Sequence, residues 1–195
     1  MSRQRTGVTT ALPVAIALAV TIMMFCGCGN GTPATPTPTG TATAATATAT
    51  ATPTAATGAV LNAEAPGFTL PTADGGTVAL DDLKGQPVMV TFWTTKCGAC
   101  RSQVPFVQAA FEERGEEVSF VAVNIGESSE TVQEYANAAG VGFTVALDQY
   151  GQAASAYNIR FIPDNFFIDE EGIIRYIRVG AFGSTEELLA VLDSL

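Results

Sequence analysis

The sequence predicts an α/β domain over residues 59–195, and two features of the chain support this prediction. Segments rich in β-branched and aromatic residues alternate with segments of helical periodicity, which is typical of strands that alternate with helices. One apolar segment, residues 88–93, is nearly continuous and suits a strand buried on both faces of a sheet. This part of the chain is long enough to bury one hydrophobic core.

The first expected elements surround that buried strand. Residues 67–70 and 77–80 form a short hairpin about the turn Ala73-Asp74-Gly75-Gly76, whose glycines suit a tight reversal. A helix over residues 98–114 follows the buried strand directly. The next expected elements are a second buried strand at 118–124 and a helix at 130–139.

The second half of the domain is expected to hold an insert and a C-terminal β-β-α unit. The expected members are a strand at 143–147, helical turns over 152–157, and antiparallel strands at 165–168 and 173–179. Ser184 and Glu187 have the spacing of a capping box, which opens a last helix with leucines along its apolar side.

Residues 1–28 have the features of an export signal. Two arginines supply its positive start, and residues 11–25 form an apolar run that is shorter than the ~20 residues of a membrane span. The run ends in Phe25-Cys26-Gly27-Cys28, which resembles the lipobox of bacterial lipoproteins. The resemblance implies lipidation at Cys28, and the alternative is an uncleaved signal-anchor. Either one places the domain outside the cytoplasm, beside a membrane.

Residues 29–58 are predicted to be a disordered tether. Thr, Ala and Pro dominate this segment, which carries neither a charge nor a large apolar residue. A segment of such composition has nothing to bury against the entropy of ordering its backbone. We therefore expect the folded domain to begin at residue 59.

Composition and charge exclude several classes of function. The chain has no histidine, which rules out a Ser-His-Asp or Cys-His nucleophile and any imidazole metal site. Its 19 acidic residues against 9 basic ones give a net charge of −10, which argues against binding nucleic acid through a basic patch. We expect neither a metal site nor a cofactor.

The most informative motif is Cys97-Gly98-Ala99-Cys100, which follows the buried strand and opens the next helix. Free amide groups and the positive end of the helix dipole stabilise a thiolate on Cys97, the expected nucleophile. Cys100 lies one turn further on and closes a disulfide after Cys97 has attacked a partner. The alternatives are a zinc site, which lacks two of its four ligands, and an inert structural disulfide.

Residues 63–193 resemble the TlpA/ResA-like branch of the thioredoxin superfamily, which comprises extracytoplasmic thiol–disulfide oxidoreductases. Besides the Cys pair and Pro105, the matching motifs are Ala65-Pro66-Gly67-Phe68-Thr69-Leu70, Leu83-Lys84-Gly85-Gln86-Pro87, Val90-Thr91-Phe92-Trp93, Tyr157-Asn158-Ile159-Arg160-Phe161-Ile162-Pro163 and Phe166-Phe167-Ile168-Asp169. The resemblance implies a thioredoxin-like α/β fold, in which helices flank a central mixed β-sheet with an N-terminal β-hairpin and a central insert.

The resemblance also implies roles for residues around the Cys pair. Pro163 is expected to be a cis-proline that faces the two thiols and belongs to the catalytic site. The backbone of Ile162 then offers hydrogen bonds to an extended partner peptide. Pro105 is expected to kink the active-site helix. Trp93 is expected to pack beneath the site. We expect Trp93, Ile162 and Lys96 to be the residues that bind a partner.

Three positions near the thiols depart from the family's pattern. Lys96 stands where Trp is common, and its charge favours the Cys97 thiolate unless it is only a solvated surface residue. Gln103 replaces a glutamate that handles protons in some members, and Thr91 replaces the buried aspartate of thioredoxins. No acid–base helper is therefore evident in the local sequence.

Two further departures flank Pro163. Asp164 stands where Thr is usual. It either approaches the thiols, where it raises the pKa of Cys97 or relays protons, or it is a plain exposed loop carboxylate. Phe161 replaces a common glycine and is expected to reshape the groove that receives a partner.

These observations favour a membrane-tethered thiol–disulfide oxidoreductase that reduces disulfides of exported proteins, such as apocytochrome c, through a mixed disulfide on Cys97. Its implied electron donor is a membrane thiol. One alternative is a thiol peroxidase: Thr94 and Cys97 match part of the peroxiredoxin pattern, although Val90 replaces its proline and only Arg101 is close in sequence. The other alternative is a non-enzymatic binding module. The sequence leaves open the direction of electron flow, the donor, the membrane and the oligomeric state.

Overall fold

The computed structural model describes residues 58–195. The predicted export signal (1–28), with lipidation at Cys28, lies outside the described residues, and so does the predicted tether (29–58) except for Gly58. Within residues 58–195, none of the helices has the length and apolarity required to cross a membrane.

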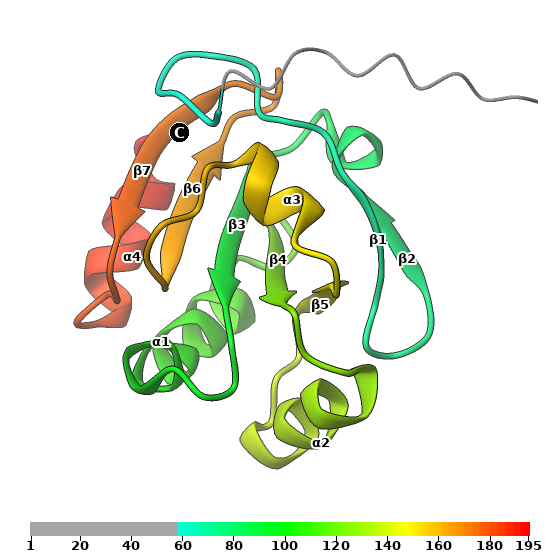
Figure 1. The fold of residues 1–195 in the computed structure, drawn as a ribbon. Helices are drawn as coiled ribbons and strands as arrows, with labels where there is room; N and C mark the ends of the chain where they lie inside the picture. The colour runs from blue at the N-terminus through cyan, green and yellow to red at the C-terminus, as the bar shows by residue number, and fades with distance from the viewer. Residues whose placement is uncertain (1–57) are drawn as a thin grey trace, which may run out of the picture. The chain divides into compact units, whose positions relative to one another are not determined.

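A five-stranded mixed β-sheet forms the centre of the fold (Figure 1), in the order β5-β4-β3-β6-β7. The strands are β3 (Val88–Trp93), β4 (Ser119–Ile125), β5 (Thr144–Asp148), β6 (Asp164–Ile168) and β7 (Ile174–Val179). β3, β4 and β5 are parallel, whereas β6 runs antiparallel to β3, and β7 runs antiparallel to β6. Every residue of β3 is buried, as its nearly continuous apolar sequence predicts.

The N-terminal hairpin lies beside β5. Its strands β1 (Thr69–Pro71) and β2 (Thr77–Ala79) pair antiparallel, and a 3₁₀ helix, η1 (Leu80–Leu83), follows them. A single bridge between Thr72 and Ala146 connects the hairpin to β5. The hairpin and η1 each bury a leucine in the hydrophobic cluster on this face of the sheet.

Helices cover both faces of the sheet. They are α1 (Gly98–Arg114), α2 (Ser129–Ala139), α3 (Gln152–Ala156) and α4 (Thr185–Leu192). One hydrophobic cluster joins α1, α2 and α4 to one face, and the other joins the hairpin, η1 and α3 to the opposite face. β3 contributes to both clusters because its side chains alternate: Met89 and Trp93 belong to the first, and Val90 and Phe92 belong to the second.

The structure confirms the predicted order of elements, with its hairpin, insert and C-terminal β-β-α unit. The bounds predicted for β3 and α1 are those observed, and most other bounds shift by one or two residues. α2 ends as predicted because Gly140 takes a left-handed conformation, with φ of 67°, that closes the helix. η1 was not predicted, since its four residues are too few to show a helical periodicity.

Candidate active site

Cys97 and Cys100 form a disulfide at the start of α1, the helix that follows β3. Cys97 is the N-cap of α1, and the backbone N–H of Cys100 donates to its Sγ over 3.0 Å. One helical turn therefore brings the two residues together, with their Cα atoms 5.2 Å apart. When the disulfide is open, the positive end of the α1 dipole and this amide stabilise a thiolate on Cys97.

The two sulfurs differ in access from solution. Cys97 is half-buried, whereas Cys100 is 3% exposed and belongs to the hydrophobic cluster beneath α1. Gln103, Val107 and Ala110 follow Cys100 at helical spacing on the same buried side of α1. A partner sulfur therefore reaches Cys97 and not Cys100.

The loop between α3 and β6 faces Cys97. Its Ile162–Pro163 peptide bond is cis, as the resemblance implies, and the carbonyl oxygen of Ile162 lies 3.7 Å from Sγ of Cys97. The loop reaches Cys97 because β6 is antiparallel to β3 and begins at the end of the sheet where β3 stops (Figure 1). The N–H of Gly180 donates to the carbonyl of Pro163 over 2.7 Å, which fixes the loop to the end of β7.

A carboxylate that sequence reasoning did not single out holds the loop in front of Cys97. Glu127 accepts hydrogen bonds from the N–H and the Oγ1 of Thr95, each over 2.7 Å, and from Nδ2 of Asn124 over 2.8 Å. Burial raises the pKa of Glu127, but these hydrogen bonds and the nearby charge of Lys96 lower it more, so the pKa lies below its ordinary value. Glu127 therefore stays ionised and anchors the loop.

The position of Glu127 carries a signal that sequence reasoning can use. Glu127 comes two residues after the end of β4, and β4 lies parallel to β3. Loops that follow neighbouring parallel strands meet at the carboxyl edge of the sheet, where ligands and catalytic groups gather in α/β folds. A polar residue directly after β4 is therefore expected near the loop that follows β3.

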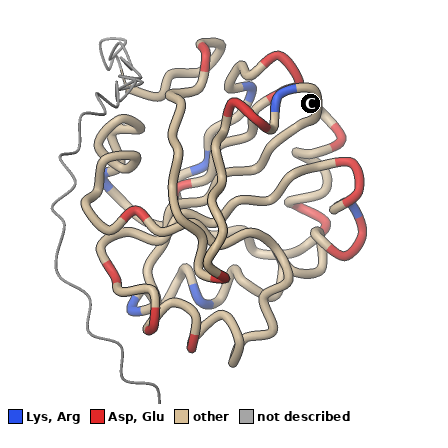
Figure 2. The backbone as a smooth tube through the Cα atoms, turned by 90° about the vertical axis from the view of Figure 1, so that its right-hand side faces the viewer, with Lys and Arg blue, Asp and Glu red and all other residues tan. Residues whose placement is uncertain are grey.

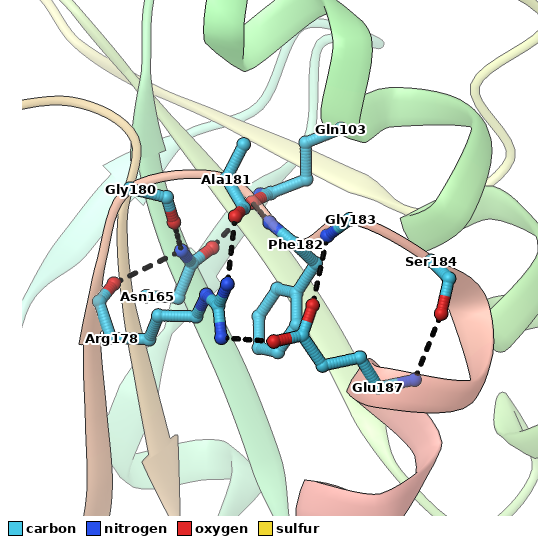
Figure 3. Close-up of polar contacts among 9 residues, drawn as sticks. All are labelled: Gln103, Asn165, Arg178, Gly180, Ala181, Phe182, Gly183, Ser184 and Glu187. Carbon is cyan, nitrogen blue, oxygen red and sulfur yellow. Dashed lines mark hydrogen bonds and ion pairs between the residues drawn. The ribbon is translucent and has the colours of Figure 1, made fainter.

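Gln103 lies at the centre of a buried polar network (Figure 3). Its Nε2 donates to Oδ1 of Asn165 over 2.8 Å. The same Nε2 donates to Oγ1 of Thr91 over 3.3 Å. Its Oε1 accepts a hydrogen bond from the N–H of Phe182 over 3.1 Å. The amide thereby joins α1 to β3, β6 and the loop after β7. Gln103 and Thr91 do not titrate as a carboxyl group does, so neither position supplies a proton to Cys100.

The network continues toward the C-terminal helix. Nδ2 of Asn165 donates to the carbonyls of Arg178 and Gly180, at 3.1 and 3.0 Å. The guanidinium of Arg178 pairs with Glu187 over 2.5 Å and lies 4.5 Å from the centre of the Phe182 ring. These contacts tie the segment between β7 and α4 to the helix that carries the Cys pair.

Asp164 is the first residue of β6 and is only 7% exposed, so the exposed-loop alternative is wrong. It pairs with Phe92 of β3. The next residue in β6, Asn165, directs its side chain toward α1, and consecutive side chains of a strand point to opposite faces. The side chain of Asp164 therefore lies on the face of the sheet opposite Cys100. Burial raises the pKa of Asp164 to about 6, against a smaller lowering by the backbone N–H of Asn165. Its Oδ1 finds no hydrogen-bond partner among residues 58–195.

Trp93 packs beneath the site, as expected. It is 5% exposed, and its ring centre lies 5.3 Å from that of Tyr135 on α2. Trp93 and Cys100 line the same internal cavity, which has a volume of about 20 Å³. The buried indole leaves little surface for contact with a partner.

Other residues singled out in the sequence lie on the surface around the Cys pair. Lys96 is exposed directly before Cys97, and Arg101 and Pro105 are exposed on α1. Phe161 is 72% exposed in the loop that carries the cis-proline. The accessible sulfur is thus bordered by cationic and apolar side chains.

Residues 61–177, more than half of the chain, match the AhpC/TSA family. The chain belongs to this family. Among its relatives, the thiol-disulfide oxidoreductase ResA of Bacillus subtilis is 34% identical over 128 residues, which make up 65% of this chain and 70% of ResA. The thioredoxin-like protein YneN of the same species is 32% identical over 126 residues, or 63% of this chain and 74% of YneN.

Solved structures place this AhpC/TSA-family chain among thioredoxin-like folds. A thiol:disulfide interchange protein of the thioredoxin family from Chlorobium tepidum aligns with a TM-score of 0.63 at 25% identity, over 69% of this chain and 97% of that one. StoA from Bacillus subtilis aligns with a TM-score of 0.57 at 26% identity, over 64% and 94%. The chain is a ResA-like oxidoreductase of thioredoxin-like fold, which confirms the predicted fold and enzyme class.

Proposed function

We propose that this protein works at the extracytoplasmic face of the cell membrane and reduces disulfides of exported proteins. The observation that carries the proposal is the asymmetry of the Cys pair. Cys97 is the reachable sulfur, set at the start of α1 and against the carbonyl of Ile162, while Cys100 is buried one turn away. The location rests on the leader sequence, and the reducing direction rests on the resemblance to the TlpA/ResA-like branch.

The first step is attack by the Cys97 thiolate on one sulfur of a substrate disulfide. A bond forms between Sγ of Cys97 and that sulfur, the substrate S–S bond breaks, and the second substrate sulfur leaves as a thiolate that takes up a proton. The start of α1, the N–H of Cys100 and the charge of Lys96 favour the attacking thiolate.

Cys100 then resolves the mixed disulfide. Its thiolate attacks Sγ of Cys97, the mixed disulfide breaks, and the remaining substrate sulfur leaves and takes up a proton. The substrate has gained two electrons and two protons, and the protein is left with the Cys97–Cys100 disulfide that the structure contains. A membrane dithiol restores both thiols by the same exchange in reverse.

The proposed substrates are exported proteins whose cysteine pairs must be reduced before use, such as apocytochrome c before haem attachment. A lipid on Cys28 would hold the protein at the membrane, and the Thr/Ala/Pro-rich residues 29–58 would let the domain reach its partners. These assignments rest on the lipobox-like end of the leader and on the composition of the segment.

The reduction potential of the Cys97–Cys100 pair tests the direction of electron flow. The full chain, with Cys26 and Cys28 replaced by serine, is equilibrated in graded thiol buffers in detergent. A value near about −270 mV, as in thioredoxin, is expected for a reductase. A value near about −120 mV would instead mark a disulfide donor. Oxidation of Cys97 by peroxide much faster than that of a free thiol would favour the peroxidase alternative.

Trapping of the mixed disulfide tests the roles of the two cysteines. Cys100→Ser removes the resolving sulfur, so exported partners should accumulate on Cys97 as adducts that dithiothreitol releases. Cys97→Ser is the matched control, because it changes the same atom at the reachable position and should yield no adduct. Equal adducts on both variants would contradict the assignment of Cys97 as the attacking sulfur.

A further inference from the structure

Residues 58–195 contain seven of the chain's nine basic residues, since Arg3 and Arg5 lie outside this range. Four of the seven form ion pairs with carboxylates: Lys84, Arg114, Arg175 and Arg178. The other three are exposed and form no ion pair within the described part of the chain: Lys96, Arg101 and Arg160.

The three unpaired cations belong to the two segments that meet at the reachable sulfur. Lys96 directly precedes Cys97, and the N–H of Arg101 donates to the carbonyl of Cys97 over 3.0 Å, one helical turn away. Arg160 lies three residues before Pro163, in the loop that faces Cys97. Chain geometry therefore keeps the Cα of Arg160 within about 11 Å of that of Pro163.

This concentration of positive charge contrasts with the rest of the molecule. All 19 acidic residues belong to residues 58–195, and Figure 2 shows them at several separate places on the described backbone. Glu127 compensates part of the charge of Lys96, because the two are close enough for Lys96 to lower the pKa of Glu127. Arg101 and Arg160 form no ion pair among the described residues, so their charges are not compensated in this way.

An apolar side chain and a surface depression complete the surroundings of the sulfur. Phe161 follows Arg160 and is 72% exposed, so most of its side chain is free to contact a partner. Arg101 lines an open depression of about 570 Å³ together with Gly98 at the start of α1 and Tyr135 on α2. A segment that passes over Cys97 thus has space beside α1, on the side where Arg101 lies.

We infer that Lys96, Arg101, Arg160 and Phe161 form a recognition surface for partner segments in which acidic and apolar side chains flank the reacting cysteine. Charge complementarity argues for this occupant, because opposite charges speed the encounter of two surfaces and like charges oppose it. An apolar side chain of the same segment covers Phe161. The inference rests on the proposed function and names the substrate class of that same site.

Three disulfide peptides test the inference. Each carries the same Cys-Ala-Ala-Cys loop and a leucine, and its flanking residues are all Asp, all Ser or all Lys. The reduced full chain, with Cys26 and Cys28 replaced by serine, is mixed with each peptide, and Trp93, the single tryptophan, reports oxidation of the adjacent Cys100. Each rate is divided by that of 2-mercaptoethanol with the same peptide, which removes differences in the intrinsic reactivity of the peptides.

The variants are Arg101→Gln and Arg160→Gln, singly and together, and Lys84→Gln, which matches each single variant in net charge. Lys84→Gln removes one positive charge from an exposed ion pair before β3, and Cys97 follows β3, so the two sites are separated by about 20 Å of strand. That distance exceeds the Debye length of about 10 Å at 0.1 M salt. An effect of net charge alone would therefore also appear in Lys84→Gln, although this substitution leaves the proposed surface unchanged.

The expected result is an Asp-flanked peptide that reacts about tenfold faster than the Lys-flanked one at low salt, with the Ser-flanked peptide between them. The preference should shrink in about 0.5 M salt, disappear in the double arginine variant and persist in Lys84→Gln. Equal normalised rates for the three peptides, or a preference that survives in the double variant, would overturn this inference and leave the proposed function standing. If none of the peptides oxidises the Cys pair, the proposed function fails as well.

Discussion

Asp164 provides the sharpest test of the energetics, because its carboxyl group is buried on the face of the sheet away from the thiols. Burial raises its pKa to about 6 from an ordinary value of 3.8, and its Oδ1 has no hydrogen-bond partner among the described residues. Asp164→Asn keeps the size of the side chain and an oxygen that accepts from the N–H of Asn165, but it cannot ionise. The substitution therefore isolates the cost of the buried charge.

The sign and the size of the effect follow from the pKa. A pKa that is higher in the folded state means that the folded chain binds the proton more tightly, so the free energy of unfolding falls as pH rises from about 3.8 to about 6. One pKa unit corresponds to about 1.4 kcal/mol, which bounds the loss at about 3 kcal/mol. Relaxation and solvent screening reduce it, so we expect about 1–3 kcal/mol above pH 6.

Urea unfolding of oxidised residues 58–195 between pH 4 and pH 8 measures this effect. Asp164→Asn and the parent should be equally stable near pH 4, and the variant should be more stable by about 1–3 kcal/mol near pH 7.5. Asp82→Asn, at an exposed position in η1, is the matched control and should leave the pH profile of the parent unchanged. A constant difference between Asp164→Asn and the parent at every pH would refute the reasoning.

Three other substitutions probe the surroundings of the Cys pair. Gln103→Leu should lower the free energy of unfolding by about 2–5 kcal/mol in urea titrations, because it leaves the N–H of Phe182 and Oδ1 of Asn165 buried without partners; a loss below 1 kcal/mol would contradict that account. Glu127→Ala should speed amide exchange at Thr95 and cost about 2–4 kcal/mol at pH 7. The lowered pKa means that the parent has this stability above about pH 4.5 and loses it as pH falls, so a cost that stays the same at pH 3 would argue against the ionised anchor. Phe161→Ala should lower the rate with peptide disulfides several-fold and leave the rate with oxidised glutathione unchanged; equal losses with both would exclude a contact with the partner.

The site illustrates which features local sequence can predict. The Cys pair, its place after β3 and the roles expected of its two sulfurs follow from neighbouring residues, because a helix N-terminus and one turn of α1 would supply the chemistry. Glu127 was missed because it comes from a loop after another strand, 32 residues away from Thr95 in the chain. Glu127 could be placed beside Thr95 only with the knowledge that β3 and β4 are parallel neighbours in the sheet.

Gln103 and Asp164 show where residue identity was not enough. Gln103 stands where some family members have a glutamate, which indicates that a proton carrier is absent. Only the packing of α1 against β6 shows that the side-chain amide of Gln103 has three hydrogen-bond partners. Asp164 has the sequence of a loop residue next to a proline, and only its strand register, opposite Phe92, buries it. A carboxyl group changes its pKa with burial, and burial is a property of the assembled layers.

The sequence by itself determined the alternation of strands and helices, the redox motif and the lack of imidazole chemistry. These features depend on periodicity and on residues adjacent in the chain. Only the tertiary structure decided how far each sulfur is buried, what anchors the loop before Cys97, and which cations are left without an ion pair. Such features depend on distances between residues from different elements, and these distances are set only when the sheet and its helices have packed.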